Sequence, residues 1–412
     1  MDMVFLGTSS QPTSSRYTSA TAVRLPCGSY VLFDVGEGTQ RRLMAGQCAV
    51  KPSRIAAVAV THLHGDHVFG LPGLVCAVLN AGGGPLHVYG PLGIRAFLRT
   101  SLATTYSFSR GLFVHEMRPA PPPLLAPAES SLLAEDVPPD ATHTFADMYI
   151  GGSTVVRGYT PGDKNLYYAP PDEASPEALA TPHWMLPLEL PSAAGASGPA
   201  VTLHAAVIEH VPHVLTVGYV LEEAPRPGSL DVDKLKATPG VGRLGAWCKS
   251  LVGGVDVTLS NGTHLRSEDY VSPARPGRKI VVLGDTCDPS GIAPLATNAD
   301  VLVHEASLRS ADRVKAVDRG HSTTCMAGEF AASVSAGHLV LNHLSPKYIG
   351  SGDSAADTAA AAAIRAEAVA AFGSPAVTVA QDFLTVSVLP STRSRPAPQV
   401  VVDPRPDHAS TE

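Results

Sequence analysis

Three histidines and one aspartate lie within six positions in the run Thr61-His62-Leu63-His64-Gly65-Asp66-His67. Zinc and similar metals favour imidazole nitrogen and carboxylate oxygen, and this spacing lets one turn of backbone supply several ligands. Side chains alternate along a strand, so His62 and His64 are expected to point the same way and share one ion, while Asp66 and His67 face a neighbouring ion. The alternative is three unrelated surface histidines around a glycine turn, which a total of 16 histidines in 412 residues does not favour.

A pair of metal ions needs more ligands than this run offers, because each ion takes about three protein groups and keeps a position open. Further candidate ligands occur later in the chain, and each of them follows an apolar stretch that is expected to be a strand. Taken singly, a strand-end Asp is more often a cap, and a lone His is more often structural. Together they complete a set for two ions, in which the two oxygens of Asp285 could bridge. The seven candidate ligands are His62, His64, Asp66, His67, His210, Asp285 and His343.

The elements that must position these ligands are short Val-, Ile- and Leu-rich runs between turn residues, which indicate strands. Helices are expected over 71–79, 326–334 and 355–372, with Gly373 ending the last. Many strands with few helices favour an α/β fold of sheets packed face to face with helices outside. The expected strands are 4–6, 21–25, 30–34, 55–60, 87–89, 201–207, 218–222, 279–283, 301–304, 338–342 and 376–380.

Two regions interrupt this pattern. Residues 119–199 are crowded with Pro, Ala and Ser, and the tail 391–412 contains four further prolines. Such compositions bury too little apolar area to offset chain entropy. We therefore expect a flexible surface insertion at 119–199 and a disordered tail at 391–412.

Composition limits the classes of function. The net charge of −7 argues against a uniformly basic nucleic-acid-binding surface, so a polyanionic substrate would need a local positive patch or metal ions. The six cysteines show no paired spacing and are expected to be reduced thiols in a cytosol-like compartment. No secretory signal or bilayer-spanning apolar run is recognised, so we expect a soluble, cytoplasmic protein, with the nucleus possible.

The chain resembles a known family at these residues. Residues 62–67 are similar to the metal motif of the metallo-β-lactamase superfamily, and the wider run 61–73 looks like that of tRNase Z, the zinc endonuclease that trims precursor tRNA 3′ ends. The resemblance runs in order from about Met3 to Val388 and implies a catalytic domain over 1–390, built as a metallo-β-lactamase αββα sandwich of two mixed sheets with outer helices. The further matching motifs are 5–10, 32–40, 283–286, 303–307, 320–323 and 341–348.

The resemblance also implies a role for each ligand and two Zn²⁺ ions per chain. His62, His64 and His210 would hold one zinc. Asp66, His67 and His343 would hold the other, with Asp285 between the two ions and Asp66 also orienting or deprotonating the attacking water. The chain is two residues longer than the family pattern after His210, which leaves His213 as a rival ligand.

Glu305 and His321 match two further motifs of the family, in which the histidine helps to protonate the leaving oxygen. An imidazole held by a carboxylate suits proton donation at neutral pH. The structural alternative is a buried salt link that supports a loop. Ser307 replaces the threonine of the first of these motifs and keeps its hydroxyl.

Residues 224–252 look like the arm with which the family grips tRNA. A local excess of positive charge on an acidic protein suits contact with a phosphate backbone, although a basic loop is more often only solvated. In addition, residues 12–16 resemble a phosphate-binding loop in which Arg16 could contact a phosphate, although Ser14 and Tyr17 replace its usual lysine and asparagine. The basic residues of the arm are Arg226, Lys234, Lys236, Arg243 and Lys249.

The implied function is zinc-dependent removal of the 3′ trailer from precursor tRNA, which leaves a 3′ hydroxyl on the tRNA and a 5′ phosphate on the trailer. The chain length is typical of the short form, which acts as a homodimer. One alternative is a hydrolase of the same fold that acts on a small thioester, lactam or sulfate ester. Another is a non-catalytic RNA-binding relative, which is expected to have lost metal ligands.

Overall fold

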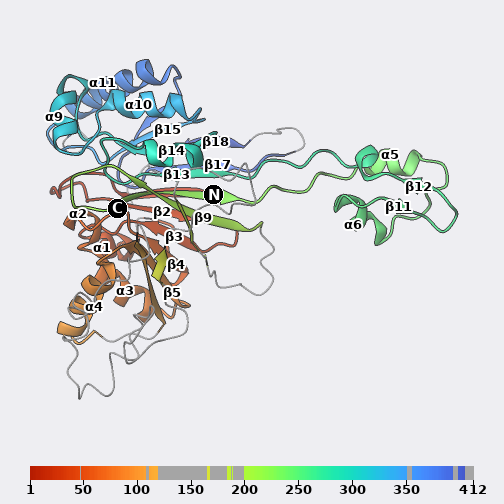
Figure 1. The fold of residues 1–412 in the computed structure, drawn as a ribbon, viewed down its shortest axis with the longest axis horizontal. Helices are drawn as coiled ribbons and strands as arrows, with labels where there is room; N and C mark the ends of the chain where they lie inside the picture. The colour runs from red at the N-terminus through yellow and green to blue at the C-terminus, as the bar shows by residue number, and fades with distance from the viewer. Residues whose placement is uncertain are drawn as a thin grey trace, which may run out of the picture.

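Two β-sheets packed face to face form the body of the protein, and helices cover both outer faces (Figure 1). The computed structural model describes residues 1–46, 48–107, 111–118, 165–167, 183–186, 188, 199–349, 355–392 and 398–403.

The first sheet has nine strands and is mixed. Its strands from β3 to β7 run parallel, and those from β18 to β3 are antiparallel. In spatial order they are β18 (Gln399–Asp403), β17 (Thr385–Leu389), β1 (Asp2–Gly7), β2 (Ala20–Arg24), β3 (Tyr30–Phe33), β4 (Ile55–Ala59), β5 (Leu86–Pro91), β6 (Leu112–Arg118) and β7 (Asn165–Tyr167).

The second sheet has seven strands and is also mixed, with parallel pairing from β16 to β13 and antiparallel pairing from β13 to β8. In spatial order they are β16 (Val377–Val379), β15 (Leu339–Asn342), β14 (Val301–Glu305), β13 (Lys279–Val282), β10 (Thr216–Glu223), β9 (Val201–Ile208) and β8 (His183–Leu186). Parallel strands of one sheet end at the same edge, so the residues that follow β13, β14 and β15 lie close together.

Three apolar layers hold the sandwich together. One lies between the sheets, one between the first sheet and helices α3 and α4, and one between the second sheet and helices α8, α10 and α11. The expected αββα sandwich is therefore confirmed. The body helices are α1 (Thr39–Met44), α2 (Gly65–Val68), α3 (Leu71–Asn80), α4 (Ile94–Thr104), α8 (Ala293–Ala296), α9 (Arg313–Asp318), α10 (Thr324–Ser333) and α11 (Ala355–Phe372).

The helices follow their sequence signals. Pro72 occupies the first turn of α3, where its missing N–H costs nothing. Gly373 ends α11 with a φ of 73°, and its N–H donates to the Val369 carbonyl. Among the residues that the structure describes, no helix combines the length and apolar character needed to cross a membrane.

Hydrogen bonds join the two sheets at one edge. The N–H of Val217 donates to the Thr61 carbonyl (3.0 Å), and the Tyr219 hydroxyl donates to the Val60 carbonyl (2.6 Å). At Gly284 a Cβ atom would lie only 2.7 Å from Cβ of Thr61, so the ends of β4 and β13 approach as closely as glycine allows. This edge carries the residues that follow both strands.

Two expectations about irregular regions need correction. Within the tail 391–412, which was expected to be disordered, β18 pairs with β17 along its whole length, and Val400 and Val402 pack against the core between the sheets. Residues 393–397 and 404–412 lie outside the described residues. Within the expected insertion 119–199, β8 pairs with β9, and Trp184 and Leu186 are buried. Both segments form edge strands because a few alternating or bulky apolar side chains suffice to add a strand to the edge of a sheet. Most of 119–199 lies outside the described residues.

The segment between β10 and β13 projects from the body as an arm (Figure 1). It spans 224–278 rather than the expected 224–252, because its returning half also pairs with the outgoing half through the bridges Arg226–Arg275 and Leu230–Val271. Leu235, Leu251 and Leu265 form a small core of its own at the tip. The tip contains α5 (Val232–Ala237), α6 (Trp247–Val252), β11 (Val257–Thr258), β12 (His264–Leu265) and α7 (Ser267–Tyr270).

Glu367 on α11 joins this outer helix to the chain between β14 and α9. Its carboxylate accepts hydrogen bonds from the Arg309 guanidinium (2.7 and 2.5 Å), from the N–H and hydroxyl of Ser310 (3.1 and 2.8 Å) and from the Thr324 hydroxyl. Partial burial alone would raise the pKa of Glu367, but these donors outweigh it and lower the pKa to about 2. The ionised carboxylate therefore stabilises the fold.

We expect Glu367→Gln to lower the free energy of unfolding by about 2 kcal/mol at pH 7, because the charged acceptor of several hydrogen bonds is lost. The folded-state pKa is depressed, so the stabilisation is complete above the ordinary pKa of 4.5 and is lost as the pH falls from there toward 2. Urea unfolding of both proteins between pH 7 and pH 3.5 should therefore show a shrinking difference. The control Glu329→Gln breaks only the surface pair with Arg313 and should cost about 0.5 kcal/mol. A difference that stays constant with pH would contradict the role of charge.

Candidate metal centre and cleft

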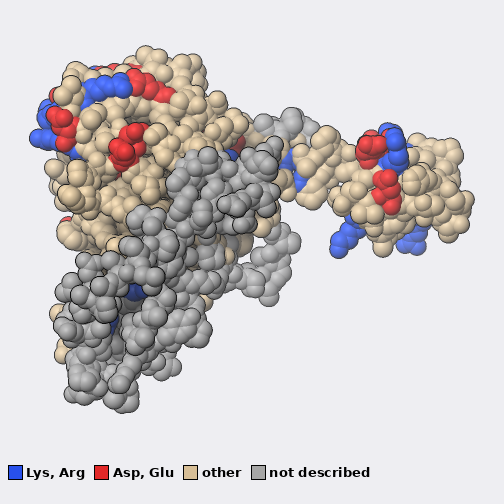
Figure 2. All heavy atoms as spheres, viewed as in Figure 1, with Lys and Arg blue, Asp and Glu red and all other residues tan. Residues whose placement is uncertain are grey.

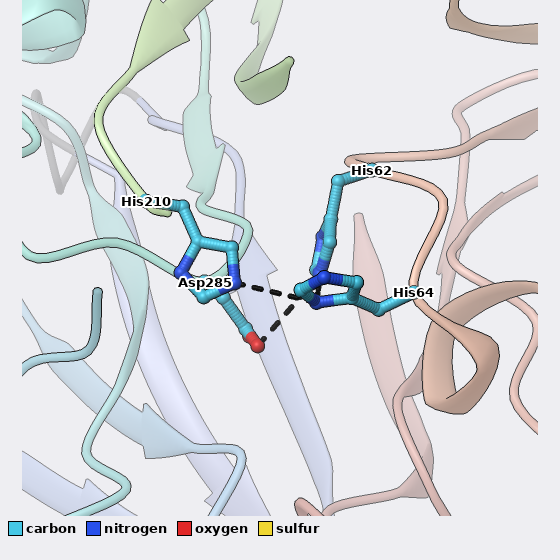
Figure 3. Close-up of side chains that lie close together, drawn as sticks. All are labelled: His62, His64, His210 and Asp285. Atoms are coloured by element: carbon cyan, nitrogen blue, oxygen red, sulfur yellow. Dashed lines mark hydrogen bonds and ion pairs between the residues drawn. The ribbon is translucent and has the colours of Figure 1, made fainter. Parts of the chain in front are cut away.

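One group of ligand atoms gathers around His64 (Figure 3). Its Nδ1 lies 3.0 Å from Nε2 of His62 and 3.3 Å from Nε2 of His210. His62 follows β4 and His210 follows β9, so the two sheets contribute to one cluster. Burial lowers the pKa of His62 well below its usual range, and the neighbouring His67 lowers it further. The neutral ring keeps a lone pair for a metal.

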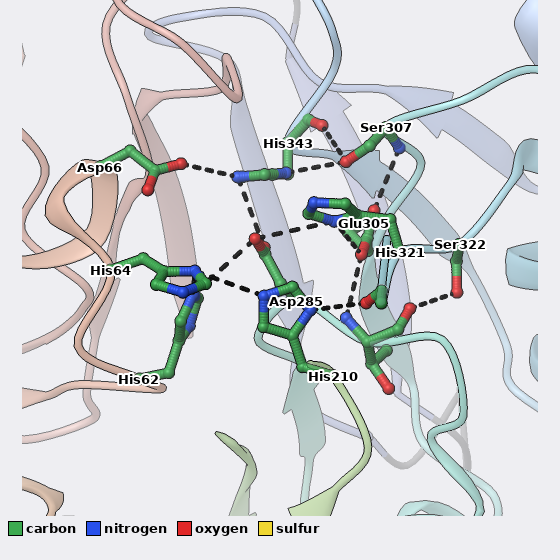
Figure 4. Close-up of polar contacts among 12 residues, drawn as sticks. His62, His64, Asp66, His210, Asp285, Glu305, Ser307, His321, Ser322 and His343 are labelled. Carbon is green, nitrogen blue, oxygen red and sulfur yellow. Dashed lines mark hydrogen bonds and ion pairs between the residues drawn. The ribbon is translucent and has the colours of Figure 1, made fainter. Parts of the chain in front are cut away.

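A second group gathers around His343, directly after β15 (Figure 4). Its Nε2 lies 3.2 Å from Oδ2 of Asp66 and 3.3 Å from Nε2 of His67. Burial would raise the pKa of Asp66, but a hydrogen bond with His343 and the charge of His67 lower it. Asp66 is therefore ionised at neutral pH, and a quarter of its side chain remains exposed.

Asp285 faces both groups with different oxygen atoms. Its Oδ2 lies 3.8 Å from Nε2 of His62, and its Oδ1 lies 3.4 Å from Nε2 of both His67 and His343. The carboxylate is buried, which would raise its pKa, but His343, His67 and His62 hold its pKa well below the usual range. This geometry suits one carboxylate that bridges two cations.

The donor set fits zinc. Ligand atoms about 2.1 Å from one zinc ion in tetrahedral geometry lie about 3.4 Å from one another. The ligand atoms of each group lie within 4.8 Å of one another, and their closest pairs are separated by 3.0 to 3.3 Å. Imidazole nitrogens and carboxylates are also the ligands that zinc prefers. All seven expected ligands lie in these two groups, whereas His213 is exposed and lies outside them.

Three residues orient the ligands, and the sequence reasoning gave none of them this role. Oδ2 of Asp34 lies 2.7 Å from Nδ1 of His67, and the Ser307 hydroxyl lies 2.9 Å from Nδ1 of His343. The Gly320 carbonyl accepts from Nδ1 of His210 (2.6 Å). Such contacts fix the ring and leave the other nitrogen for a metal. Asp34 also has a φ of 58°, a conformation rare outside glycine. Only its place in a strand-end motif could have pointed to it.

Glu305 and His321 form an ion pair beside the metal centre (Figure 4). Oε1 of Glu305 lies 2.9 Å from Nδ1 of His321, and the N–H groups of Thr286 and Ser307 donate to the same carboxylate. Burial alone would lower the pKa of His321, but Glu305 and Asp285 raise it to about 9. His321 therefore carries a proton at neutral pH and keeps Nε2 free of this pair.

A cleft of about 260 Å³ opens over both ligand groups. Ser10 and Gln11 line it, but Arg16 does not. Arg16 was expected to contact substrate, but its guanidinium is buried here and donates to the carbonyls of Thr8 and Ile349 and to the Thr8 hydroxyl. Arg16 therefore stabilises the loop of residues 12–16 through contacts inside the protein.

The arm residues expected to bind substrate lie away from the cleft, and most are exposed. Lys236, Arg243 and Lys249 are exposed on the arm, whereas the ammonium of Lys234 donates to the Asp269 carbonyl (2.6 Å). The whole arm carries eight Lys and Arg against five Asp and Glu, on a chain of net charge −7. Figure 2 shows basic side chains on the surface of its tip.

The fold and the site define a protein of the metallo-β-lactamase superfamily. A family model described as "Metallo-beta-lactamase superfamily" matches residues 15–169. Among curated relatives, ribonuclease BN of Enterobacter sp. (strain 638) is 32% identical over 94% of this chain and 100% of its own length. Zinc phosphodiesterase ELAC protein 1 of Homo sapiens is 33% identical over 94% of this chain and 98% of its own.

A solved structure agrees with these relatives. The short form of human tRNase Z (ELAC1) superposes with a TM-score of 0.55 at 25% identity, covering 94% of this chain and 99% of that chain. The chain belongs to the tRNase Z family.

We expect Gly320→Ala to weaken zinc binding by at least tenfold. A Cβ at this position would lie 2.7 Å from both the carbonyl carbon and Nδ1 of His210, so this ligand must move. Zinc content after dialysis against a competing chelator measures the effect. Gly373→Ala is a matched control, because Gly373 has the same φ of 73° and nothing within 4 Å of its Cβ position. Equal zinc loss in both variants would show that backbone strain, rather than contact with His210, is responsible.

Proposed function

We propose that the protein is a zinc-dependent endoribonuclease that removes 3′ trailers from precursor tRNA. The single observation that carries this proposal is the pair of ligand groups bridged by Asp285 beneath a cleft, in a chain of the tRNase Z family. The names of the relatives, which include ribonucleases and a zinc phosphodiesterase, support the same reaction class. The basic arm supports a large polyanionic substrate.

Each ligand group would hold one zinc ion, which gives two per chain. Zinc bound there supplies Lewis acidity, which makes water nucleophilic near neutral pH and stabilises charge on phosphate oxygens. His62, His64 and His210 would hold the first ion. Asp66, His67 and His343 would hold the second, with Asp285 shared between them.

Two side chains that line the cleft, Asp66 and His321, would handle the protons. Asp66 is ionised and partly exposed, so it can orient and deprotonate the attacking water. His321 carries a proton and is held by Glu305, so its Nε2 can protonate the leaving 3′ oxygen of the tRNA. The bond between phosphorus and this oxygen breaks, which leaves a 3′ hydroxyl on the tRNA and a 5′ phosphate on the trailer.

We infer a homodimer and a cytoplasmic location from the family, and sedimentation equilibrium of the purified chain would test the first of these.

The function is tested by incubating the purified protein with a 3′-extended tRNA, with and without a chelator of divalent metals. We expect cleavage directly after the discriminator base, complete loss with the chelator, and recovery on addition of zinc. End-group analysis should find a 3′ hydroxyl on the tRNA. Absence of metal-dependent cleavage at that position would reject the proposal.

The two histidine roles are separable. His321→Ala should slow tRNA cleavage by about 100-fold or more with both zinc ions retained, because proton transfer by a positioned side chain contributes about that factor. His64→Ala should lose zinc as well as activity. Metal analysis alongside single-turnover rates distinguishes them, and equal zinc loss in both variants would mean that His321 only supports its loop.

The arm should matter for tRNA alone. Replacing residues 227–274 by a short Gly/Ser linker keeps the bridge between Arg226 and Arg275 that closes its base. We expect tRNA cleavage to fall by about 100-fold or more, while hydrolysis of bis(p-nitrophenyl) phosphate stays within about twofold, because this small diester cannot reach the arm. A parallel loss for both substrates would favour a small-molecule hydrolase whose fold depends on the arm.

A further inference from the structure

Three cations line one wall of the cleft and have no part in the metal centre. Lys315 lies on α9, Arg319 directly follows this helix, and Lys347 lies in the loop after His343. All three are exposed, and they line the same cleft as Asp66 and the ion-paired His321. In Figure 2, basic side chains lie on the surface beside acidic ones at the end of the body where Figure 1 places α9.

Among the described residues, these cations lack the carboxylate ion pairs that the neighbouring Arg309 and Arg313 form. Arg313, on the same helix, makes two hydrogen bonds of 2.8 Å with the Glu329 carboxylate. Lys315 and Arg319, the residue that caps the end of this helix, are four positions apart, and both line the cleft. Within the described part of the chain, neither of them nor Lys347 forms an ion pair with a carboxylate.

The two segments that carry these cations are fastened together. The Tyr348 hydroxyl donates to Oδ2 of Asp312 (2.7 Å), the residue that precedes α9. Nζ of Lys347 lies 5.1 Å from the centre of the Tyr348 ring. The hydrogen bond from Tyr348 lowers the pKa of Asp312, and the charges of Lys347 and Lys315 lower it further. One carboxylate therefore lies near two of the three cations. The wall keeps a positive excess.

A nucleic acid strand in the cleft supplies the missing counterions. Every nucleotide carries a phosphate, and basic side chains that replace its bound cations gain free energy by releasing them. The metal centre would take the phosphate that is cut. A neighbouring phosphate therefore needs a different set of cations, and this wall is the part of the cleft that offers them.

The position of the wall indicates which neighbour it binds. Arg319 is two residues before His321, the proposed proton donor to the leaving 3′ oxygen. This oxygen belongs to the discriminator nucleotide, the last nucleotide of the cleaved tRNA, whose other phosphate is on its 5′ side. We propose that Lys315, Arg319 and Lys347 bind the phosphate on the 5′ side of that nucleotide, so that the cleft holds two consecutive phosphates. This inference rests on the proposed function.

The test uses the full chain with the triple substitution Lys315→Met, Arg319→Met and Lys347→Met. We expect kcat/KM for a 3′-extended tRNA to fall at least tenfold, equivalent to about 1.4 kcal/mol. The dependence of log kcat/KM on log salt should become shallower by about 0.7 for each phosphate that the variant no longer binds. The triple variant should retain its zinc content. Its kcat/KM for bis(p-nitrophenyl) phosphate, which has one phosphate, should fall far less than its kcat/KM for tRNA. Arg313→Met is the matched control, because it removes a cation of the same helix that faces Glu329.

Substrates with one neutral methylphosphonate linkage decide which phosphate is bound. Neutralising the linkage on the 5′ side of the discriminator nucleotide should slow the wild-type protein about tenfold and the triple variant by less than twofold. Equal slowing of both proteins by this substrate would overturn the assignment. The assignment would also fall if the triple variant instead lost its sensitivity to a methylphosphonate at the first linkage of the trailer. Failure of the wild-type protein to cut unmodified tRNA would reject the proposed function itself, and the inference with it.

Discussion

One buried carboxylate determines how the site is built. Asp285 presents one oxygen to His62 and the other to His67 and His343, so both ligand groups depend on its position. A buried anion is costly unless positive charge surrounds it, and here the surrounding groups are imidazoles or the cations that they would bind. The carboxylate can lie there only because the ends of β4 and β13 approach each other, which Gly284 allows.

The sandwich converts this close approach into a metal centre. His62 follows β4 in the first sheet, while His210, Asp285 and His343 follow strands of the second sheet. Hydrogen bonds from Val217 and Tyr219 to the end of β4 join the sheets at this edge. The ligands therefore sit on rigid strand ends, which preorganises them for a metal.

Charge is divided between separate parts of the molecule. The chain as a whole is acidic, the centre of the cleft is lined by carboxylates and imidazoles, and the positive excess lies on the arm and on the wall formed by α9 and the loop after His343. The acidic body disfavours indiscriminate binding of nucleic acid. The local basic surfaces allow a nucleic acid strand to bind at the arm and at the cleft. The arm extends away from the body (Figure 1), and this extended shape suits a large polyanionic substrate.

Strand periodicity and the run from His62 to His67 are local signals, so the sequence by itself indicated stacked sheets with outer helices and four of the seven candidate ligands. Positions after expected strands added the other three ligands, and the family resemblance implied the αββα arrangement. The sequence did not determine the full length of the arm, the strand β18 or the burial of Trp184, since pairing at a sheet edge depends on partners distant in the chain. Only the tertiary structure placed His210 rather than His213 beside His64 and turned Arg16 into the interior. It also brought Asp34 to His67 and Gly320 to His210, because contacts between residues tens to hundreds of positions apart leave no trace in local spacing.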